Sequence, residues 1–559
     1  MNILGISSYY HDSAAAILKD GHLIAASAEE RFNRIKHYNG FPRQAILFCL
    51  QQAKLTPGEI DYIAFYDKPF VKFDRILTSF IANFPKSREA FVQVIPVWLK
   101  ERLLTKEKIG DLLGDVPVIF SEHHLSHAAS AFFVSPFKES AIMTVDGVGE
   151  WTTSALGFGN DREIHLGQEL RFPHSLGLLY NAVTAYLGFR VNSDEWKVMG
   201  LAPYGRSIYK SQLEKLILLN ADGSFKLNMK YFSFDHSFNS MFNNKFEELF
   251  GAPKREPEEP ITQFHQNVAA SAQAAVETVL IMMAKHLRGI YDTKNLCIAG
   301  GVGLNCVANW KILKQAGFEN VFVQPASGDD GAALGAAFFV HHQLLKHKRD
   351  FVMRHAYWGP EYADEEIEQY LKNKGANFEK LDTPDLIDKA SGFIVKDKII
   401  AWFQGRTEWG PRALGNRSIL ANPLNPGMRE MINAKVKNRE NFRPFAASVL
   451  EESSAELFEF KESPFMMFAV PGKPGTSDII SSVVHVDGTS RIQTVSEADN
   501  LLFYSLIKRV GEKNGIPVVL NTSFNYAEEP IVCSPDDAYR CFMKTAINYL
   551  FLGHYLVTK

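Results

Sequence analysis

Two histidines one helical turn apart are the first residues of this sequence whose types and spacing could do chemistry. His123 and His127 lie in EHHLSHAASAF, where small residues favour a closely packed helix. Residues i and i+4 project from one face of a helix, so both imidazoles could ligate one metal ion. Such pairs also occur by chance, so the pair alone is a weak indication of a metal.

Aspartates in two polar turns could complete such a site. Asp146 follows an apolar run at 141–145, and Asp329 and Asp330 stand in the glycine turn at 327–331. Two imidazoles with carboxylates form a mixed nitrogen and oxygen site, which suits iron, manganese or zinc. Asp329 and Asp330 are both candidate ligands. The alternative interpretation is that these aspartates only stabilise turns through hydrogen bonds to the backbone.

A third histidine, His11, lies in the polar turn YYHDS between apolar segments at 3–7 and 14–18. Because the ordinary pKa of histidine is near neutral pH, His11 could accept a proton from an attacking hydroxyl. A structural hydrogen bond explains it equally well. Lys36 could contact an anionic ligand, although charges at the density found there more often form a solvated face.

Two glycine-rich turns each lead from an apolar run into a helix. Gly300, Gly301 and Asn305 lie in the first, LCIAGGVGLN, and the second is SGDDG at 327–331. Free backbone amides at the start of a helix attract anions, so both turns are candidate phosphate sites.

The segment at 406–443 is strongly basic in a chain whose net charge is −3. Eight cations and three glutamates give it a local charge of +5. The cations are Arg406, Arg412, Arg417, Arg429, Lys435, Lys437, Arg439 and Arg443. Because guanidinium groups bind phosphate in a bidentate way, the segment predicts a site for a phosphorylated small molecule. RNA binding and a solvated surface are the alternatives; the interleaved glycines, Trp409 and Phe442 argue against the second.

Two or more domains must position these residues, because 559 residues exceed the size at which one core stops growing. The β-prone runs at 3–7, 14–18 and 23–28 surround polar turns, and the same order recurs at 141–158. This recurrence predicts a duplicated α/β domain. The charged stretch at 345–350, followed by WGP at 358–360, predicts a first domain at 1–345 and a second at 355–559.

Composition predicts an ordinary globular protein, with 46% apolar and 22% charged residues. Five scattered cysteines without a C-x-x-C pair argue against disulfides and a thiolate zinc site. The first residues lack the features of a secretory leader, and no run of about 18 apolar residues occurs. We therefore expect a cytoplasmic protein that binds no membrane. The net charge gives no general attraction to nucleic acid.

The motifs, taken together and in order, resemble those of the NodU/CmcH family of O-carbamoyltransferases. They are GISSYYHDSAAAILKDG from Gly5, AEERFNRIKH from Ala28, EHHLSHAASAF from Glu122, DEWKVMGLAPYG from Asp194, GGVGLN from Gly300, SGDDGAALGAA from Ser327, RTEWGPRALGNRSILANP from Arg406, NFRPFAASVL from Asn441 and LNTSFN from Leu520. Such a series is more specific than any single motif. The resemblance implies an α/β fold, with an N-terminal actin-like ATPase domain of two ribonuclease H-like halves and a C-terminal YrdC-like domain.

The resemblance also implies two reactions. In the C-terminal domain carbamoyl phosphate is hydrolysed and the carbamate is adenylated by ATP, which gives carbamoyl adenylate. In the N-terminal domain the carbamoyl group passes from AMP to a hydroxyl of a small natural product or sugar. Because carbamate is unstable in water, a closed path between the sites is expected. The acceptor is not identified by the sequence, and a homodimer is the default expectation.

The resemblance assigns roles to individual residues. His123, His127, Asp146 and Asp329 would hold a divalent metal, with Fe(II) favoured and Asp329 preferred because it directly follows Gly328. His11 would be the general base, Lys36 a contact to carbamoyl adenylate, and Gly300, Gly301 and Asn305 contacts to the nucleotide. The residues expected at carbamoyl phosphate and the phosphates of ATP, which binds with Mg²⁺, are Arg406, Arg412, Arg417, Ser418, Lys437, Arg443, Arg491 and Ser523.

Three other functions share parts of this pattern. A tRNA-modifying threonylcarbamoyl transferase has the first fold, but the acidic net charge and the attached second domain argue against it. A sugar kinase has no function for the arginine-rich segment, so that interpretation leaves the segment unexplained. A non-enzymatic ATP sensor or scaffold would leave the paired histidines unexplained.

Overall fold

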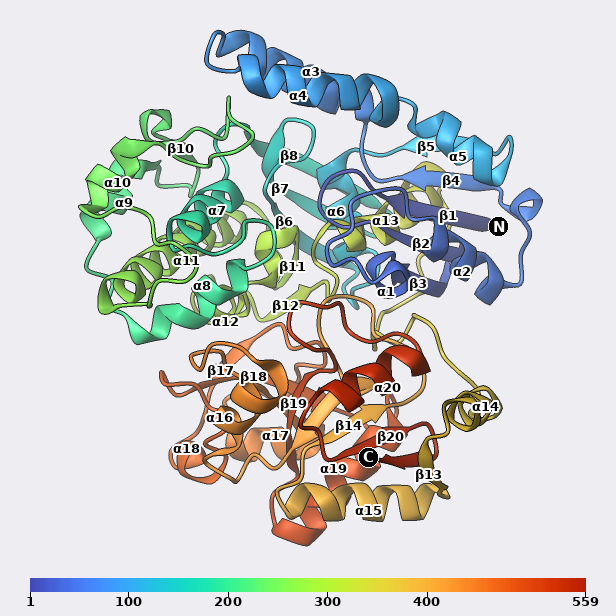
Figure 1. The fold of residues 1–559 in the computed structure, drawn as a ribbon. Coiled ribbons are helices and arrows are strands. Elements are labelled where there is room, and N and C mark those ends of the chain that lie inside the picture. Colours follow the sequence, from blue (N-terminus) through green and yellow to red (C-terminus); the bar gives the residue numbers. More distant parts are fainter. The chain divides into compact units, whose positions relative to one another are not determined.

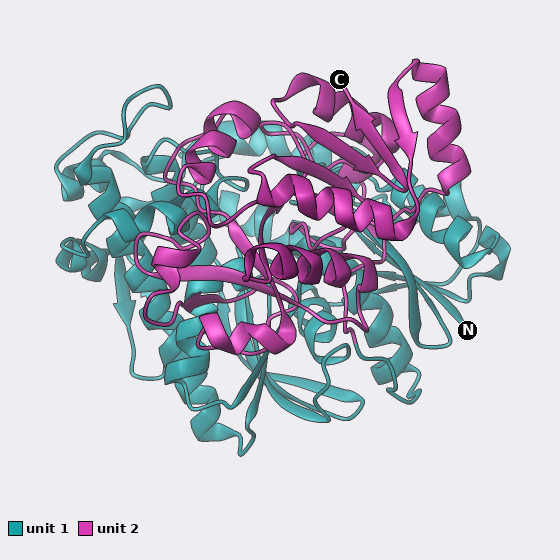
Figure 2. Ribbon diagram, turned by 90° about the horizontal axis from the view of Figure 1, so that it is seen from below, with its two compact units in different colours: residues 1–26, 37–352 teal, residues 27–36, 353–559 magenta.

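A computed structural model describes residues 1–559 and divides them into two compact units (Figure 2). Unit 1 consists of Met1–Ala26 and His37–Val352, and unit 2 of Ser27–Lys36 and Met353–Lys559. The short segment Ser27–Lys36 therefore folds with unit 2, although most of the chain around it belongs to unit 1.

Unit 1 contains one sheet topology twice (Figure 1). The first sheet has the order β3-β2-β1-β4-β5 and the second β8-β7-β6-β11-β12. In each, the central strand is antiparallel to the hairpin strand that follows it and parallel to the strand on its other side. The strands are β1 (Asn2–Ser7), β2 (Ala14–Lys19), β3 (His22–Ala28), β4 (Tyr62–Phe65), β5 (Val118–Phe120), β6 (Glu139–Val145), β7 (Thr152–Asn160), β8 (Glu163–Arg171), β11 (Asn295–Ala299) and β12 (Asn320–Val323). The predicted duplication and the α/β class are confirmed.

Two helices, α6 (His123–Phe132) and α13 (Asp329–Phe338), pack against each other between these sheets (Figure 1). Small residues allow the approach: a Cβ added to Gly335 would lie 1.8 Å from the carbonyl oxygen of Ser126. A Cβ added to Gly5 of β1 would lie 1.9 Å from the carbonyl oxygen of Ala333. This packing fixes the first turns of α6 and α13, where three of the candidate metal ligands are located.

The remaining helices of unit 1 surround this core. They are α2 (Arg43–Ala53), α3 (Pro69–Ala82), α4 (Arg88–Val97), α5 (Thr105–Leu113), α7 (Leu176–Tyr186), α8 (Glu195–Leu201), α9 (Lys210–Leu216), α10 (Asn244–Phe250), α11 (Gln263–Ile290) and α12 (Cys306–Gln315), with a hairpin of β9 (Ile217–Leu219) and β10 (Phe225–Leu227). Helix α11 is long and apolar enough to cross a membrane, but 61% of its most apolar window is buried in the protein. Buried core helices pass the same criteria, so α11 is a weak indication of a membrane span.

Unit 2 is built on a nine-stranded mixed sheet of order β13-β21-β20-β14-β15-β19-β16-β18-β17. The strands are β13 (Asn377–Lys380), β14 (Ile400–Phe403), β15 (Arg417–Ala421), β16 (Ala446–Leu450), β17 (Ala469–Pro471), β18 (Thr489–Val495), β19 (Val518–Ser523), β20 (Tyr549–Leu552) and β21 (Tyr555–Thr558). The helices are α1 (Glu30–Asn33), α14 (Asp364–Lys374), α15 (Thr383–Val395), α16 (Met428–Ile432), α17 (Glu451–Leu457), α18 (Thr476–Ile479), α19 (Leu501–Asn514) and α20 (Pro535–Lys544).

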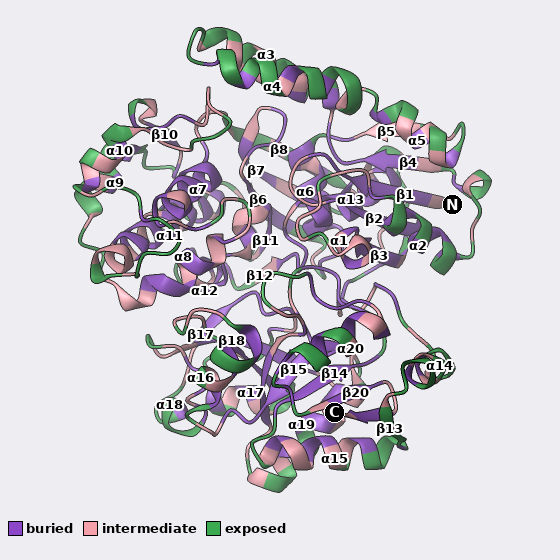
Figure 3. Ribbon diagram, viewed as in Figure 1, coloured by how far each residue is buried: buried purple, intermediate pink, exposed green.

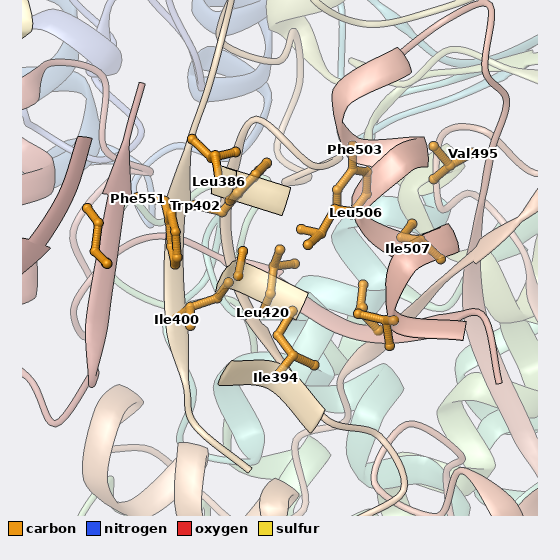
Figure 4. Packing of buried hydrophobic residues seen from close by; sticks show 14 of the residues in the cluster. Leu386, Ile394, Ile400, Trp402, Leu420, Val495, Phe503, Leu506, Ile507 and Phe551 are labelled. Carbon is orange, nitrogen blue, oxygen red and sulfur yellow. The ribbon is translucent and has the colours of Figure 1, made fainter. Parts of the chain in front are cut away.

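The core of unit 2 lies between the sheet and the helices α15 and α19 (Figure 4). Leu386 and Ile394 of α15, Phe503 of α19, and Trp402 and Phe551 of the sheet are all buried in it. The strands that carry them are coloured as buried in Figure 3. The loop after β14 therefore begins at the end of a strand that is packed in this core.

A pair of buried histidines after α13 makes the stability of unit 1 depend on pH. His342 is fully buried, and its ring stacks on Phe338 with centroids 5.4 Å apart. Burial lowers the pKa of His342 to about 4 and has the same effect on its neighbour His341. Between pH 6.5 and 4 the unfolded chain therefore binds a proton that folded His342 does not, so stability falls as the pH falls.

We expect His342→Phe to reduce this acid sensitivity, because phenylalanine keeps the stacked ring and cannot bind a proton. The contribution of His342 to unfolding free energy should be up to about 3 kcal/mol by pH 4. The measurement is the urea midpoint at pH 7 and pH 4.5. His165→Ala, which removes an exposed histidine of unit 1, is the control. An equal loss of stability at pH 4.5 in the wild type and His342→Phe would refute the role of His342.

Candidate active site

Four buried side chains of unit 1 converge on one point. His123 and His127 come from the first two turns of α6, Asp146 follows β6, and Asp329 begins α13. The Nε2 atoms of the two histidines lie 3.1 Å apart, and Asp146 Oδ2 lies 3.2 Å from His123 Nε2. Asp329 Oδ1 is 3.7 Å and 3.6 Å from the same two nitrogens. We call these four residues the His2Asp2 cluster.

The dimensions of the His2Asp2 cluster fit a metal ion. Ligand bonds of about 2.1 Å place neighbouring ligand atoms roughly 3.0–3.5 Å apart, close to the separations found here. The Nδ1 atoms of His123 and His127 are buried without a hydrogen-bond partner, whereas their Nε2 atoms face each other within the cluster. Although burial raises the pKa of Asp146, the hydrogen bond from His123 and the charge of His127 hold it well below its usual range. The donor set is that of a first-row divalent metal.

The glycine turn after β11 supports this cluster. Gly300 has φ of +92°, and a Cβ there would lie 2.3 Å from the carbonyl oxygen of Val145, so glycine is required. The Gly301 amide donates to Asp146 Oδ1 at 2.8 Å. Asn305 caps α12 by accepting from the Ala308 amide, and its side chain also pairs with Gln273. The three predicted nucleotide residues therefore lie together, and all three have structural hydrogen bonds, since the Gly300 amide donates to the Ser327 carbonyl oxygen.

His11 lies in the turn between β1 and β2, next to its neighbour Asp12. Its Nδ1 is 2.5 Å from Asp12 Oδ2, and its Nε2 is 2.5 Å from the carbonyl oxygen of Asn192. Both partners only accept hydrogen bonds, so both ring nitrogens carry protons and the ring is an imidazolium. Burial lowers the pKa of His11, but the Asp12 carboxylate raises it more, to well above the usual value. In this arrangement His11 is positioned but has no free lone pair.

A second group of charged residues, all cations, gathers in unit 2. Burial, followed by the charges of Arg443 and Arg491, lowers the pKa of Arg439 well below its usual range. Lys437 is affected in the same way by burial and then by Arg439. Glu440, whose carboxylate is 3.3 Å from Arg443, is the acid that opposes Arg439. Like charges buried together favour the binding of an anion.

Other predicted phosphate contacts are bonded to the protein itself. Arg417 is fully buried; its two terminal nitrogens donate to the carbonyl oxygens of Gln404, Asn416, Pro360 and Gly405. Arg406 donates to the carbonyl oxygens of Trp358 and Gly359. The hydroxyl of Ser418 accepts from the Gly415 amide. These residues hold the loop between β14 and β15, in which Arg412 is half-buried.

Lys437 and Ser523 are brought together. The Lys437 ammonium donates to Asn525 Oδ1 at 2.6 Å and to the carbonyl oxygen of Ser523. Lys36 belongs to unit 2, where its charge acts on Lys437. The structure therefore groups Lys36 with the cations of unit 2. The contact to carbamoyl adenylate that the resemblance implies for Lys36 stays a prediction.

The sequence did not single out Arg439 as a site residue, although it lies in the basic segment. Its Nε donates to Asn433 Oδ1 at 2.7 Å, and its guanidinium lies 4.7 Å from the centroid of Phe445. Only the folded chain shows that Arg439 lies where the charges of Arg443 and Arg491 act on it. The sequence showed only that arginines are frequent in this segment. Their frequency does not indicate which of them belong to the site.

Comparison with known families covers both units. The family model described as carbamoyltransferase N-terminus matches residues 2–338, and the one described as carbamoyltransferase C-terminus matches residues 391–559. A protein of Synechocystis sp. is 44% identical over 100% of this chain and 97% of its own length. Nodulation protein NolNO of Sinorhizobium fredii is 38% identical over 99% of this chain and 80% of its own length.

More distant similarity is found as well. A Methanocaldococcus jannaschii protein is 32% identical over the full length of both chains. Among solved structures, T. kodakarensis HypF overlaps 62% of this chain and 48% of its own, with 15% identity and a TM-score of 0.32. A score at that level supports no argument about fold or function.

Proposed function

This chain belongs to the carbamoyltransferase family, and from that premise we propose that it forms carbamoyl adenylate from ATP and carbamoyl phosphate and transfers the carbamoyl group to a hydroxyl. Membership makes the chain a transferase enzyme. The choice of donor, nucleotide and acceptor is our proposal. We further propose that the acceptor is a small natural product or sugar, that ATP binds with Mg²⁺, and that the protein acts in the cytoplasm, without nucleic acid or membrane, as a homodimer.

The observation that carries this proposal is that each unit gathers charged groups of a different chemistry. Unit 2 gathers cations whose mutual repulsion a phosphorylated substrate would relieve. Unit 1 has the His2Asp2 cluster and, next to it, a histidine in a polar turn. Two steps with different needs, adenylate formation and acyl transfer, fit two such sites.

We propose that the His2Asp2 cluster holds a divalent metal, with Fe(II) favoured by the family resemblance. A bound cation would polarise the carbamoyl carbonyl or neutralise the leaving phosphate. Asp146 is held for this role by the Gly301 amide, and Asp329 by its place at the start of α13. Tyr66, whose hydroxyl is 3.5 Å from Asp329 Oδ2, supports the second carboxylate.

We propose that His11 takes the proton of the acceptor hydroxyl as the carbamoyl carbon is attacked. Asp12 fixes the ring through Nδ1, so Nε2 is the atom that would receive the proton. Before His11 can act as a base, its Nε2 must lose both its own proton and its hydrogen bond to the Asn192 carbonyl oxygen. An acceptor hydroxyl that displaces the carbonyl oxygen would supply the new partner.

The first test is pyrophosphate release from ATP by the purified protein, with and without carbamoyl phosphate and without an acceptor. We expect release that depends on carbamoyl phosphate. Arg439→Met should lower the rate about 10- to 100-fold, because one buried charge-assisted contact to phosphate is lost. Arg509→Met is the control: Arg509 is 44% exposed and pairs with Asp388 at the surface of unit 2. No release from folded, metal-loaded protein would count against the adenylating reaction.

A further inference from the structure

Helix α3 of unit 1 buries charged side chains and exposes some of its large apolar ones. It buries Lys72 and Arg75, whereas Phe70 is 71% exposed and Ile81 is also exposed. Figure 3 shows the exposed colour along much of α3. A surface helix normally does the reverse, because burying a charged group costs free energy unless it is paired. The inner face of α3 must therefore satisfy its cations.

The cations of α3 form a row at helical spacing. Lys68, Lys72 and Arg75 are separated by four and three residues, which places them on one face. The first two have carboxylate partners: Lys68 Nζ is 2.8 Å from Glu122 Oε1, and Lys72 Nζ is 2.6 Å from Asp67 Oδ2. Arg75 is only 6% exposed, yet its guanidinium makes no hydrogen bond or ion pair with the chain. Its guanidinium lies 5.1 Å from the centroid of the Phe172 ring.

This row lies near the His2Asp2 cluster, since the charge of Lys72 acts on His123. The Lys68 amide, at the start of α3, donates to Glu150 Oε1, and Glu150 also accepts from the His123 amide at 3.0 Å. Phe172 is held next to the same turn because its backbone amide donates a hydrogen bond to the Trp151 carbonyl oxygen. Lys72 lies 4.8 Å from the centroid of the Tyr10 ring, and Tyr10 interacts electrostatically with Arg75, Asp146 and Asp329.

Because no anionic group of the chain pairs with the Arg75 guanidinium, an anionic ligand would stabilise it. Burial lowers the pKa of Arg75 to about 10, while Tyr10, Glu150 and Asp67 act in the opposite direction without pairing with it. The group stays charged at neutral pH, and all five of its N–H donors are uncommitted.

We propose that the inner face of α3 is a phosphate pocket next to the His2Asp2 cluster, in which Arg75 pairs with the phosphate of the ligand. Resting on the function proposed above, this phosphate is that of carbamoyl adenylate, which leaves as AMP. The planar fork of Arg75, stacked on Phe172, matches two phosphate oxygens.

Calorimetric titration with AMP, inorganic phosphate and adenosine tests the pocket without an acceptor or catalysis. We expect wild-type protein to bind AMP at both units, and Arg75→Met to lose the site of unit 1, with affinity there reduced about 10- to 100-fold. Adenosine should bind equally to both proteins. Arg88→Met, which changes an exposed arginine of α4, should leave every titration unchanged.

The stability of the unliganded protein provides a second measurement. If Arg75 is kept for a ligand, Arg75→Met should unfold at the same temperature as wild type or higher, because a buried unpaired charge is removed. A lower unfolding temperature together with unchanged AMP binding would overturn the proposal and make Arg75 a packing residue.

The two anions distinguish the sources of the phosphate. Loss of AMP binding at unit 1 supports the adenylate, whereas loss of phosphate binding with AMP unaffected would overturn that source and keep a pocket for a free anion. Pyrophosphate release tests the proposed function separately, because it depends on the cations of unit 2. Its absence in wild type would leave the titration of Arg75 fully interpretable.

Discussion

His127→Ala is expected to leave the protein without its metal. The variant removes one of two nitrogen ligands from the His2Asp2 cluster, in which the two Nε2 atoms face each other at 3.1 Å. Loss of a group that only orients a ligand costs about 10- to 100-fold in metal affinity, so loss of the ligand itself should cost at least about 100-fold. The measurement is the metal content after anaerobic reconstitution with Fe(II) and gel filtration, about one ion per chain in wild type and close to none in the variant.

His124→Gln is a matched control for this experiment. His124 lies between the two ligands on α6, but its ring nitrogens bond to Thr144 Oγ1 at 2.8 Å and to the Thr152 carbonyl oxygen at 2.9 Å. It therefore points away from the cluster, and its replacement should leave the metal content unchanged. Equal metal content in wild type and His127→Ala, or none in reconstituted wild type, would eliminate the metal from the proposed mechanism.

The sequence predicted the elements of unit 1 well because their signals are local. Apolar runs flanking polar turns at 3–18 and 141–158 fold as β1-β2 and β6-β7, and these paired hairpins identified the duplication. The spacing of His123 and His127 was likewise local, since a helix converts four residues into one face. What spacing left open was the choice between Asp329 and Asp330.

The helix start of α13 shows which of the two aspartates faces the His2Asp2 cluster. Asp329 turns into the His2Asp2 cluster, whereas Asp330 Oδ1 accepts from the Gly331 amide at 3.0 Å. Successive residues on a helix differ by about 100° in direction, so only one of the two can face the cluster. The sequence does not show which of these two directions points toward the cluster.

Long-range contacts are what the sequence did not reveal. The segment Ser27–Lys36 reads as part of the first domain, but Arg31 donates to the Gly410 carbonyl oxygen at 2.9 Å and Arg34 to that of Ile531 at 2.7 Å. Residues hundreds of positions apart leave no periodic signal. For the same reason, a basic segment could not show that Arg417 bonds to the backbone while Arg439 faces other cations.

The protonation of His11 leads to the other large effect. Four titratable groups face this ring: Asp12 at 2.5 Å, His37 with ring centroids 4.7 Å away, and Asp329 and Glu195 through their charges. Asp12 makes the strongest favourable contact with the imidazolium, and the pKa of His11 is well above its usual value. A general base must be neutral, so the active fraction rises as the pH increases through that raised pKa. Carbamoyl transfer should therefore be slow at acid pH and increase above neutrality.

Replacing His11 or Asp12 distinguishes the role of His11 as the base from the effect of Asp12 on the pKa of His11. His11→Asn should lower transfer by at least about 100-fold and leave carbamoyl-phosphate-dependent pyrophosphate release intact, because the base acts only in the transfer step. Asp12→Asn removes the carboxylate that stabilises the imidazolium, so the pKa of His11 falls and the rising limb of the transfer rate moves to lower pH. NMR titration of selectively labelled histidine follows the same pKa without an acceptor. A His11 resonance with the same pKa in wild type and Asp12→Asn would show that Asp12 does not control the base, and normal transfer by His11→Asn would remove His11 from the mechanism.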